Sequence, residues 1–510
     1  MKKFYLTTPI YYVNGAPHIG HAYTSIAADV LARWQRLDGF EVFFLTGTDE
    51  HGQKVEKAAA EAGLDTQRFT DRVAEDFRAM AAAMGVSNDD FIRTTEERHK
   101  RACIALWERL VANDAIYLGH YEGWYAVRDE AFYGEDELVT TPDGTRLAPT
   151  GAPVEWVREP SYFFRLSAWQ EKLLAFYEQN PDFIAPVARR NEVLSFVRSG
   201  LTDLSVSRTS FTWGIPVPGD PAHVMYVWLD ALTNYITAAG FPDEADPRWP
   251  FWPADLHIVG KEIVRFHAVY WPAMLMAAGI APPRRIYSHG WWTVEGEKMS
   301  KSLGNVIDPR ELVGEFGLDP LRYFLLREVP FGNDGDFSRR ALITRLNGEL
   351  ANDLGNLAQR TLSLIARHCE GRLPALGEST PADAALREAA ARLPALLRER
   401  ITRLAFHEAL EEVWKTVRAA NAYIDHQAPW ALRKTDLVRM NTVLRVLADT
   451  LRVIATVLQP FMPASMARLL DQLGVPEDAR DLAALAEALP AGAPLPPPSG
   501  IFPRFVEPAG

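Results

Sequence analysis

Cysteine is scarce in this chain of 510 residues, which contains two, Cys103 and Cys369. A disulfide framework and a zinc site built from thiolates both need more cysteines than this, so the sequence excludes both. The sequence also lacks an apolar run of the roughly 18–20 residues that a membrane-spanning helix needs. No apolar signal core follows Lys2 and Lys3. We therefore expect a cytoplasmic protein with no membrane partner.

Positive charge is in short supply as well. The chain has 54 lysines and arginines against 66 acidic residues, a formal net charge of −12. This excess of negative charge argues against unspecific binding along nucleic acid. It does not exclude a nucleic-acid partner that binds to a local basic face. The length suggests about three structural units of roughly 150 residues each, and 48% hydrophobic residues are enough for a large core.

The first 114 residues alternate between strand and helix patterns. Residues 4–13 and 41–46 are rich in β-branched and aromatic side chains and predict strands, whereas apolar residues recur at helical spacing from Ile19. Strand, helix and strand in this order indicate a parallel sheet, which binds ligands beyond the carboxyl ends of its strands. The alternation resumes at residues 224–228 and 256–260. We expect residues 1–114 and 211–338 to form one Rossmann-like α/β catalytic domain.

Two other regions have different patterns. Residues 115–210 contain short aromatic runs separated by turns, which predicts an inserted, largely β connective module. Residues 339–510 carry apolar residues at helical spacing over long stretches and end in a Pro-rich tail. They predict an all-α helical bundle with a tail extended over its surface.

The segment Pro17-His18-Ile19-Gly20-His21 lies where the first strand gives way to a helix. A helix N-terminus attracts anions, and two imidazoles three residues apart can donate to the same phosphate. Gly20 has no Cβ, so a nucleoside could approach the backbone closely. On its own, however, such a pair is more often two ordinary histidines near a turn.

A second segment, residues 296–304, carries Lys298 and Lys301 between glycines and small hydroxyl residues. This composition suits a mobile loop that closes on a polyphosphate, although a solvated basic loop is the plainer interpretation of the segment alone. The chain has no GxxxxGK[ST] and no GxGxxG after a strand. It therefore lacks the fingerprints of P-loop proteins and of dehydrogenases.

Together the HIGH and KMSKS segments resemble the signature of class I aminoacyl-tRNA synthetases. Five further segments resemble blocks of the methionyl-tRNA synthetase family: residues 12–15, 47–52, 227–231, 260–267 and 428–430. The resemblance covers residues 4 to about 470. It implies that methionine is activated by ATP, accompanied by Mg²⁺, and is then transferred to the 3′-terminal adenosine of tRNA(Met) for translation initiation and elongation.

The resemblance also assigns roles to individual residues. It implies that the catalytic groups are His18, His21, Lys298 and Lys301. The ATP site would add Gly20, Gly260, Glu262 and Ser300. The methionine site would comprise Ile10, Tyr12, Asp49, Trp228, Ala231, Tyr235, Ile263 and His267, with Asp49 facing the substrate ammonium. The helical bundle would bind the anticodon through Asn356, Arg360 and Trp430.

Several of these residues also have a purely structural interpretation. Without the resemblance, Trp228 and Tyr235 would be taken as ordinary core, and Trp430 as packing between helices. Arginines at 339, 340, 345, 360, 367 and 372 suggest phosphate contacts despite the acidic total.

Other proteins share parts of this pattern. Leucyl and valyl enzymes have both motifs but need a larger insertion, and a cysteinyl enzyme would be expected to have zinc-ligand cysteines. A small adenylyltransferase has an HxGH turn but no use for a helical domain of about 170 residues. A non-catalytic tRNA-binding relative would have no need to keep both histidines and both lysines. The absence of an appended C-terminal tRNA-binding domain favours a monomer without an obligate protein partner.

Many methionyl enzymes bind zinc through cysteines of the inserted module, but residues 115–210 contain no cysteine and one histidine, His120. That is too little for a tetrahedral site, so we predict no structural zinc. Packing would replace the metal, through Trp124, Tyr133, Trp156, Tyr162 and Phe163. Elemental analysis of the purified protein should find no stoichiometric zinc; one zinc per chain would contradict the prediction.

Overall fold

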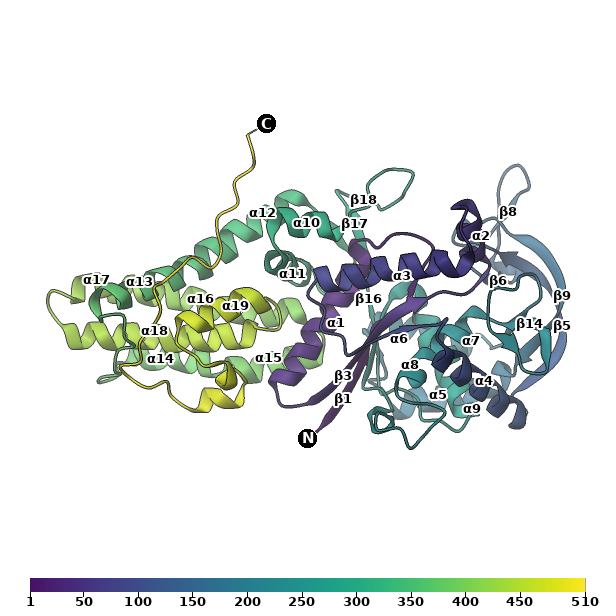
Figure 1. Cartoon of the computed structure of the whole chain (residues 1–510), viewed down its shortest axis with the longest axis horizontal. Coiled ribbons are helices and arrows are strands. Elements are labelled where there is room, and N and C mark those ends of the chain that lie inside the picture. Colours follow the sequence, from purple (N-terminus) through teal and green to yellow (C-terminus); the bar gives the residue numbers. More distant parts are fainter. Residues whose placement is uncertain (510) are drawn as a thin grey trace.

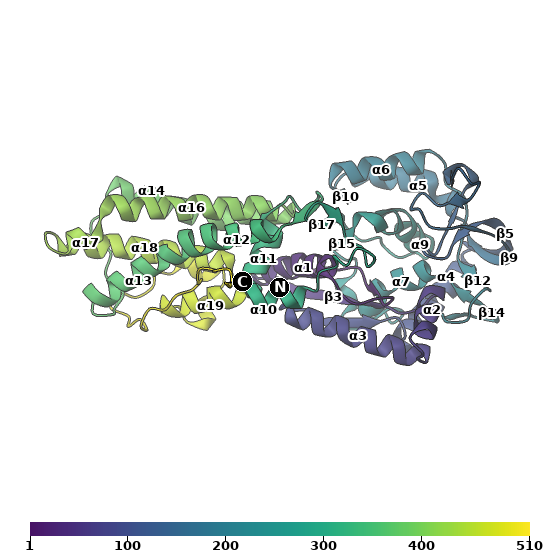
Figure 2. The same cartoon turned by 90° about the horizontal axis from the view of Figure 1, so that it is seen from above.

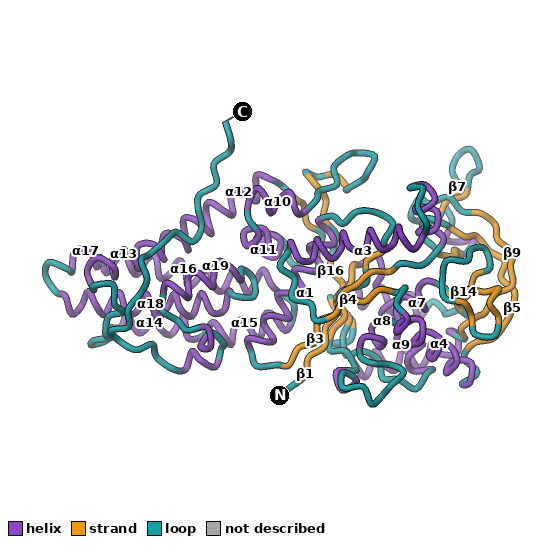
Figure 3. The backbone as a smooth tube through the Cα atoms, viewed as in Figure 1, coloured by secondary structure: helices purple, strands orange, loops and turns teal. Residues whose placement is uncertain are grey.

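Strands and helices are segregated along the long axis of the molecule. The computed structural model describes residues 1–509. Figure 3 shows the strands gathered in one half, while the other half is built from helices and loops. Figure 1 shows that the first strands and helix α1 (Ile19–Leu37) lie near the junction of the two halves. The N-terminal residues therefore lie between the sheet region and the helical region.

A seven-stranded parallel sheet forms the centre of the strand-rich half. Its strands are β1 (Lys3–Thr7), β2 (Tyr11–Tyr12), β3 (Glu41–Asp49), β4 (Asp90–Arg93), β10 (Ile184–Ala185), β15 (Leu256–Gly260) and β16 (Ile286–His289). The spatial order is β10, β16, β15, β1 and β3, with β2 and β4 also paired to β3. The chain proceeds from β1 to β3 and β4 on one side, and later adds β15 and β16 on the other. Ligands of such sheets bind at this reversal of strand order.

The single strand predicted over residues 4–13 is wrong, because β1 and β2 are separate. Pro9 lies between them and has no backbone N–H to donate to a ladder. Both pieces still pair with successive parts of β3, Leu6 opposite Phe44 and Tyr12 opposite Asp49. The break therefore sets Tyr12 beside the carboxyl end of β3.

The strand expected at residues 224–228 does not extend the parallel sheet. Strand β14 (Asp220–Met225) pairs antiparallel with β12 (Ser207–Arg208) and β13 (Pro216–Val217). Helix α7 (Val227–Leu232) begins immediately afterwards. An apolar run shows that a strand is favourable but not which sheet it joins. The run at residues 256–260, in contrast, is β15 of the parallel sheet.

Helices cover both faces of the parallel sheet, because alternate strand residues point to opposite sides. Leu6 and Phe44 pack in one hydrophobic cluster, with α1, α2 (Gln53–Glu61) and α3 (Thr66–Ala83). Tyr5 and Phe43 pack in another. The second cluster includes α4 (Glu97–Ala112), α5 (Gln170–Gln179), α6 (Val187–Arg198), α8 (Asn234–Ala238) and α9 (Trp271–Ala277). Figure 2 shows α5 and α6 on the side away from α3.

The range 115–210 contains a long antiparallel hairpin of β5 (Ile116–Ala126) and β9 (Glu155–Phe164). Strands β6 (Ala131–Tyr133) and β11 (Leu204–Ser205) extend it, and β7 (Val139–Thr140) pairs with β8 (Arg146–Leu147). Figure 1 places the hairpin at the edge of the molecule. Strand β10 from the same range joins the parallel sheet instead.

The region after the parallel sheet is largely helical, and its part from residue 339 onward is the bundle that the spacing of apolar residues predicts. Its helices are α10 (Pro309–Phe316), α11 (Leu318–Arg327), α12 (Arg339–Arg345), α13 (Asn356–His368), α14 (Pro381–Ala391), α15 (Leu393–Thr402), α16 (Phe406–Gln427), α17 (Pro429–Leu432), α18 (Leu437–Leu458) and α19 (Pro463–Gln472). A three-stranded sheet of β17 (Trp292–Val294), β18 (Glu297–Lys298) and β19 (Gly335–Phe337) precedes the bundle. Among residues 1–509, no helix combines the length and apolarity needed to cross a membrane.

Shorter helical segments connect these elements. The segments Phe266–Tyr270 and Leu346–Gly355 are π-helical. The 3₁₀ turns are Glu135–Glu137, Leu166–Trp169, Trp249–Phe251, Lys261–Ile263, Glu477–Ala479 and Ala483–Ala486. The Pro-rich tail has little regular structure and runs against residues 371–373, where the Leu373 N–H donates to the Ala493 carbonyl.

A fully buried ion pair ties α1 to the helical half. Arg322 on α11 donates to Asp29 on α1 at 2.6 Å and to the Pro460 and Phe461 carbonyls after α18 at 2.8 and 3.0 Å. Burial alone would raise the pKa of Asp29, but Arg322 and Arg33 lower it below its ordinary value. Removing one partner of such a pair leaves an uncompensated buried charge. The helix that carries both histidines is therefore anchored to the bundle.

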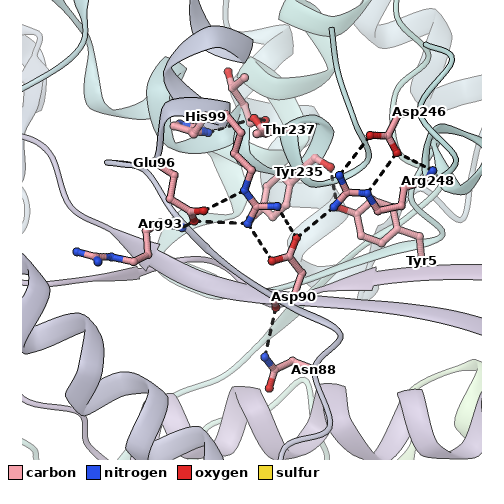
Figure 4. A network of polar contacts seen from close by, with 12 residues as sticks. Tyr5, Asn88, Asp90, Arg93, Glu96, His99, Tyr235, Thr237, Asp246 and Arg248 are labelled. Carbon is pink, nitrogen blue, oxygen red and sulfur yellow. Dashed lines mark hydrogen bonds and ion pairs between the residues drawn. The ribbon is translucent and has the colours of Figure 1, made fainter. Parts of the chain in front are cut away.

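A second polar network links β4 to α4 and to the segment before β15. Figure 4 shows the Asp90 carboxylate flanked by guanidinium groups. Arg98 donates to both carboxylate oxygens, at 2.7 and 2.9 Å, and Arg248 lies 3.7 Å away. These contacts attach β4, at the edge of the parallel sheet, to helix α4.

Candidate active site

The two histidines cap the N-terminus of α1 reciprocally. The Gly20 N–H donates to Nδ1 of His18, and the His18 N–H donates to Nδ1 of His21, both at 3.0 Å. The two rings have centroids 4.0 Å apart. Gly20 leaves room for this contact, because a Cβ would lie 2.8 Å from the His18 ring and the ring would have to shift. This is a capping box built from imidazoles.

The caps fix which nitrogen of each ring carries the hydrogen. Because Nδ1 accepts in both cases, a neutral ring carries its proton on Nε2. Burial lowers the pKa of His18 and lowers that of His21 well below the ordinary histidine value. Both rings are therefore neutral at physiological pH, with an N–H donor on the side away from the helix backbone.

The lysine segment reaches the same helix start. The Ile19 N–H, the first of α1, donates to the Ile307 carbonyl at 3.1 Å. A Cβ on Gly15 would lie 2.9 Å from Nζ of Lys301. The loop is braced by Asn305, which accepts from the Ser300 N–H at 2.8 Å and donates to the Lys298 carbonyl at 3.1 Å. Residues almost three hundred positions apart thus meet above α1.

Gly260 and Glu262 lie together at the end of β15. A Cβ on Gly260 would come within 2.4 Å of the Glu262 carboxylate oxygens, so the Glu262 side chain folds back over the glycine. Trp291 holds that carboxylate through its indole N–H at 2.6 Å. The same ring lies beneath two ammonium groups, Lys261 at 4.3 Å and Lys298 at 5.5 Å from its centroid. Lys298 thus belongs to the edge of this site.

Asp49, the last residue of β3, has a buried carboxylate oxygen, Oδ1, that lacks a hydrogen-bond partner among the described residues. Burial raises the pKa of Asp49 well above its ordinary value, and the nearby carboxylates of Asp230, Glu130 and Glu50 raise it further. A buried carboxylate oxygen of this kind is stabilised by a cation. An ammonium group is such a cation.

Aromatic side chains form an apolar wall near Asp49. Trp228 on α7 stacks on Phe266 with ring centroids 3.9 Å apart. His267 donates from Nδ1 to the Ile263 carbonyl at 3.0 Å, so its Nε2 accepts the Tyr235 hydroxyl at 2.7 Å. The π-helical turn at Phe266–Tyr270 allows this arrangement, and such turns are frequent at functional sites. The wall thus combines apolar ring faces with the Tyr235 hydroxyl, which already donates its hydrogen to His267.

The remaining residues of the expected methionine site lie on the same elements. Ile10 precedes β2, Ala231 lies on α7 three residues after Trp228, and Ile263 lies in the turn after β15. Ile10, Trp228 and Ile263 are half-buried and pack against one hydrophobic cluster, which also contains Tyr235. The structure thus gathers the expected residues around the carboxyl ends of β2, β3 and β15.

His99, Cys103 and Asp230 are the one group of three among residues 1–509 whose ligand atoms lie close enough to hold a metal ion. All three are buried, but His99 Nε2 and Asp230 Oδ1 are hydrogen bonded at 2.7 Å. His51 Nδ1 bonds the other carboxylate oxygen at 2.6 Å. These bonds satisfy the carboxylate without a metal and lock the segment at residues 47–52 onto α7.

Four residues of the site were missed by the sequence analysis. Glu130 accepts a hydrogen bond from Tyr12, His289 bonds Thr24 of α1 at 2.8 Å, and Trp291 holds Glu262. Lys54 lies 5.3 Å above the Tyr12 ring. The partners of the first three lie far away in sequence, so no local pattern could reveal the contacts.

The expected anticodon residues lie in the far part of the bundle. Arg360 on α13 donates to Asp425 and Asn421 of α16, at 2.7 and 3.0 Å. Asn356 is exposed one turn earlier, and Trp430 is 42% exposed on α17. The exposure of Trp430 argues against pure packing between helices. Of the arginines expected to contact phosphates, Arg339 and Arg345 are held in ion pairs with glutamates.

Comparisons with known proteins identify the family of the chain. A family model described as "tRNA synthetases class I (M)" matches residues 4–362. Another, "Anticodon binding domain of methionyl tRNA ligase", matches residues 373–508. The fold is that of a class I tRNA synthetase, and the chain belongs to that class.

Full-length relatives and solved structures are more specific. The chain is 57% identical to the methionine–tRNA ligase of Brucella suis biovar 1, covering 99% of this chain and 98% of the relative. It is 56% identical to that of Mesorhizobium japonicum, with 100% and 99% covered. It resembles Mycobacterium tuberculosis methionyl-tRNA synthetase in complex with methionyl-adenylate, with a TM-score of 0.97, 54% identity and 99% and 100% of the two chains covered. The chain belongs to the methionine–tRNA ligase family, as its motifs predicted.

The buried His267 generates a prediction about pH. Burial lowers its pKa to about 4, whereas an unfolded chain has a histidine pKa near 6.5. Between these values the unfolded state binds the proton and the folded state does not, so stability falls as the pH drops through this window. From pH 7 to pH 5 this residue should reduce the free energy of unfolding by about 2 kcal/mol. Denaturant titrations at both pH values measure the loss.

His267→Gln should therefore reduce the difference in stability between pH 7 and pH 5. His120→Gln is the matched control, because His120 is exposed in the insertion. Equal pH dependence in the wild type and both variants would contradict the prediction.

Proposed function

We propose that this chain is a methionine–tRNA ligase that forms methionyl-adenylate from methionine and ATP and then transfers the methionyl group to the 3′-terminal adenosine of tRNA(Met). The observation that carries the proposal is the meeting of the two motif regions at one helix start. Ile19 of the first motif bonds Ile307, three residues after the lysine segment. Lys301 of the second motif lies close to Gly15, just before the histidine segment. The names of its relatives and the methionyl-adenylate held by its structural neighbour support the choice of substrates.

The methionine site fits an amino acid with a thioether side chain. The Asp49 carboxylate, whose buried Oδ1 has no partner within residues 1–509, would bind the ammonium and become ionised when it does so. A flexible, polarizable thioether packs well on aromatic faces, which Tyr12, Trp228 and Tyr235 supply. Ile10, Ala231, Ile263 and His267 would complete the pocket. The substrate carboxylate would then lie toward the start of α1.

Activation would proceed by attack of that carboxylate on the α-phosphate, with pyrophosphate as the leaving group. The Nε2–H groups of His18 and His21 would donate to phosphate oxygens as negative charge develops, aided by the positive end of the α1 dipole. Lys301 and Lys298, with Ser300, would stabilise the departing pyrophosphate. Gly260 and Glu262 would bind the ribose, and Gly20 would allow close approach of the nucleotide. Each contact strengthens where charge builds up.

Magnesium would accompany the ATP rather than occupy a protein cage. The one metal-compatible triad among the described residues, at Asp230, is occupied by its own hydrogen bonds. Mg²⁺ commonly takes phosphate and water ligands and neutralises phosphate charge. The insertion does not fit zinc, since Asp129 binds Tyr133 at 2.8 Å and Ala126, Ala148 and Ala152 form a small apolar core there.

The regions of the chain would divide the work. Residues 1–114 and 211–338 would form the catalytic domain, residues 115–210 the connective module, and residues 339–510 the anticodon-binding domain with its tail. Asn356, Arg360 and Trp430 would read the anticodon by stacking and edge contacts. We propose a cytoplasmic monomer with no obligate protein partner.

Methionine-dependent pyrophosphate exchange into ATP tests the proposed activity, with each of the twenty amino acids supplied singly. We predict exchange with methionine alone. Exchange with leucine would change the assignment within the class, and silence with all amino acids would contradict catalysis.

Lys301→Ala should lower kcat for this exchange at least about tenfold with the KM for methionine little changed, because its contact forms mainly in the transition state. Lys57→Ala is the control, since Lys57 is exposed on α2. An unchanged kcat in Lys301→Ala would show a lysine that only decorates the surface.

Trp430→Ala tests the role of the bundle. It should reduce tRNA charging severely, because an unstacked anticodon base loses its aromatic platform. Amino-acid activation should be nearly intact, since α17 lies far along the molecule from the sheet (Figure 1). Equal loss of charging and exchange would contradict the anticodon assignment.

A further inference from the structure

Glu130, from the inserted module, extends into the proposed methionine site. It lies in the turn between β5 and β6 with a φ of 49° and is 7% exposed. Its Oε1 accepts the Tyr12 hydroxyl and, at 3.4 Å, the Lys54 N–H. Its own carbonyl accepts the Tyr226 hydroxyl at 3.0 Å. One residue of the insertion thus contacts three segments of the catalytic half.

The backbone of the catalytic half leaves space for this carboxylate. Gly52 has a φ of 114°, and a Cβ there would lie 2.5 Å from Glu130 Oε1, 2.7 Å from the Tyr12 hydroxyl and 3.0 Å from Val227. Glycine at this position therefore permits the carboxylate, the tyrosine and the start of α7 to meet. The contact between Glu130 and Tyr12 therefore depends on the backbone of the catalytic half as well as on the inserted module.

Burying the Glu130 carboxylate costs free energy, which its hydrogen bonds and nearby positive charges offset in part. Burial raises its pKa, and the hydrogen bond from Tyr12 and the charges of Lys54 and Arg208 lower it again in part. Arg208 is itself buried, with its guanidinium 4.4 Å from the Tyr226 ring centroid and 4.5 Å from that of Phe132. A buried carboxylate is destabilising unless its hydrogen bonds are made. The short contact to Tyr12 is the bond that leads to the site.

Tyr12 is the residue through which Glu130 reaches the substrate. It pairs with Asp49 in the sheet, and its ring packs beneath the Lys54 ammonium. Without an acceptor its hydroxyl would have no fixed direction, and the ring could rotate away from the strand ends. A fixed ring reduces the entropy lost when methionine binds.

We propose that Glu130 is a positioning residue of the methionine site, which holds Tyr12 by a hydrogen bond and so makes the inserted module part of amino-acid binding. This inference rests on the proposed function. It assigns Glu130 the role of a hydrogen-bond acceptor rather than a second charge for the substrate ammonium. A glutamine at this position keeps an acceptor oxygen and loses the charge, which separates the two roles.

The experiment is methionine-dependent pyrophosphate exchange by the full chain and its variants. Glu130→Ala should raise the KM for methionine about tenfold, the effect of one lost buried hydrogen bond, with kcat and the KM for ATP within about threefold. Glu130→Gln should stay within about twofold of wild type. Glu155→Ala is the control, because Glu155 is an exposed glutamate of the same module. An unchanged KM in Glu130→Ala, or equal damage in Glu130→Gln, would overturn the proposal.

A double-mutant cycle with Tyr12→Phe adds a readout that a merely structural role would not move. Tyr12→Phe should raise the KM for methionine as much as Glu130→Ala does, and the double variant should be no worse than either, because both remove the same bond. Additive losses would overturn the proposal. If Glu130→Ala fails to fold, Tyr12→Phe still removes the hydroxyl alone, and an unchanged KM in that variant overturns it. Absence of methionine exchange in the wild type would instead refute the proposed function.

Discussion

The start of helix α1 is the structural feature on which the rest of the site depends. Its free N–H groups are claimed by two imidazole nitrogens and by the Ile307 carbonyl. These bonds set the tautomers of both histidines and bring the lysine loop over the same point. Because the helix follows the strand at the reversal of strand order, the ends of β3 and β15 face it from either side. One helix terminus thereby gathers the phosphate-binding and amino-acid-binding groups.

Near the start of α1, the protein buries carboxylates, and their burial lowers the stability of the folded chain. Asp49 has a buried oxygen without a partner, and Glu130 is buried beside it. Such groups are expected where a ligand supplies the missing interaction. Rigid supports hold the elements of the site: the Asp230 carboxylate lies between two histidines, and the Arg322–Asp29 pair joins α11 to α1. The supports hold the site residues in place before any ligand binds.

The sequence was sufficient for the class of fold, the two motifs and the helical region, because each rests on local spacing or on short segments of fixed composition. It failed where the outcome depended on distant partners. Pro9 divides the first strand, the run at residues 224–228 pairs in a separate sheet, and β10 leaves the insertion for the parallel sheet. Glu130 carries no local sign of its role, since Tyr12 lies 118 positions away. Contacts of this kind are decided by tertiary packing, which periodicity does not encode.

The most direct test of this account is a crystal structure of the chain with methionine and a non-hydrolysable ATP analogue. We predict that Nε2 of His18, Nε2 of His21 and Nζ of Lys301 all contact the phosphates of the same nucleotide, while the methionine ammonium lies against Asp49. A nucleotide whose phosphates contact only one of the two motifs, with the other turned away from it, would contradict it.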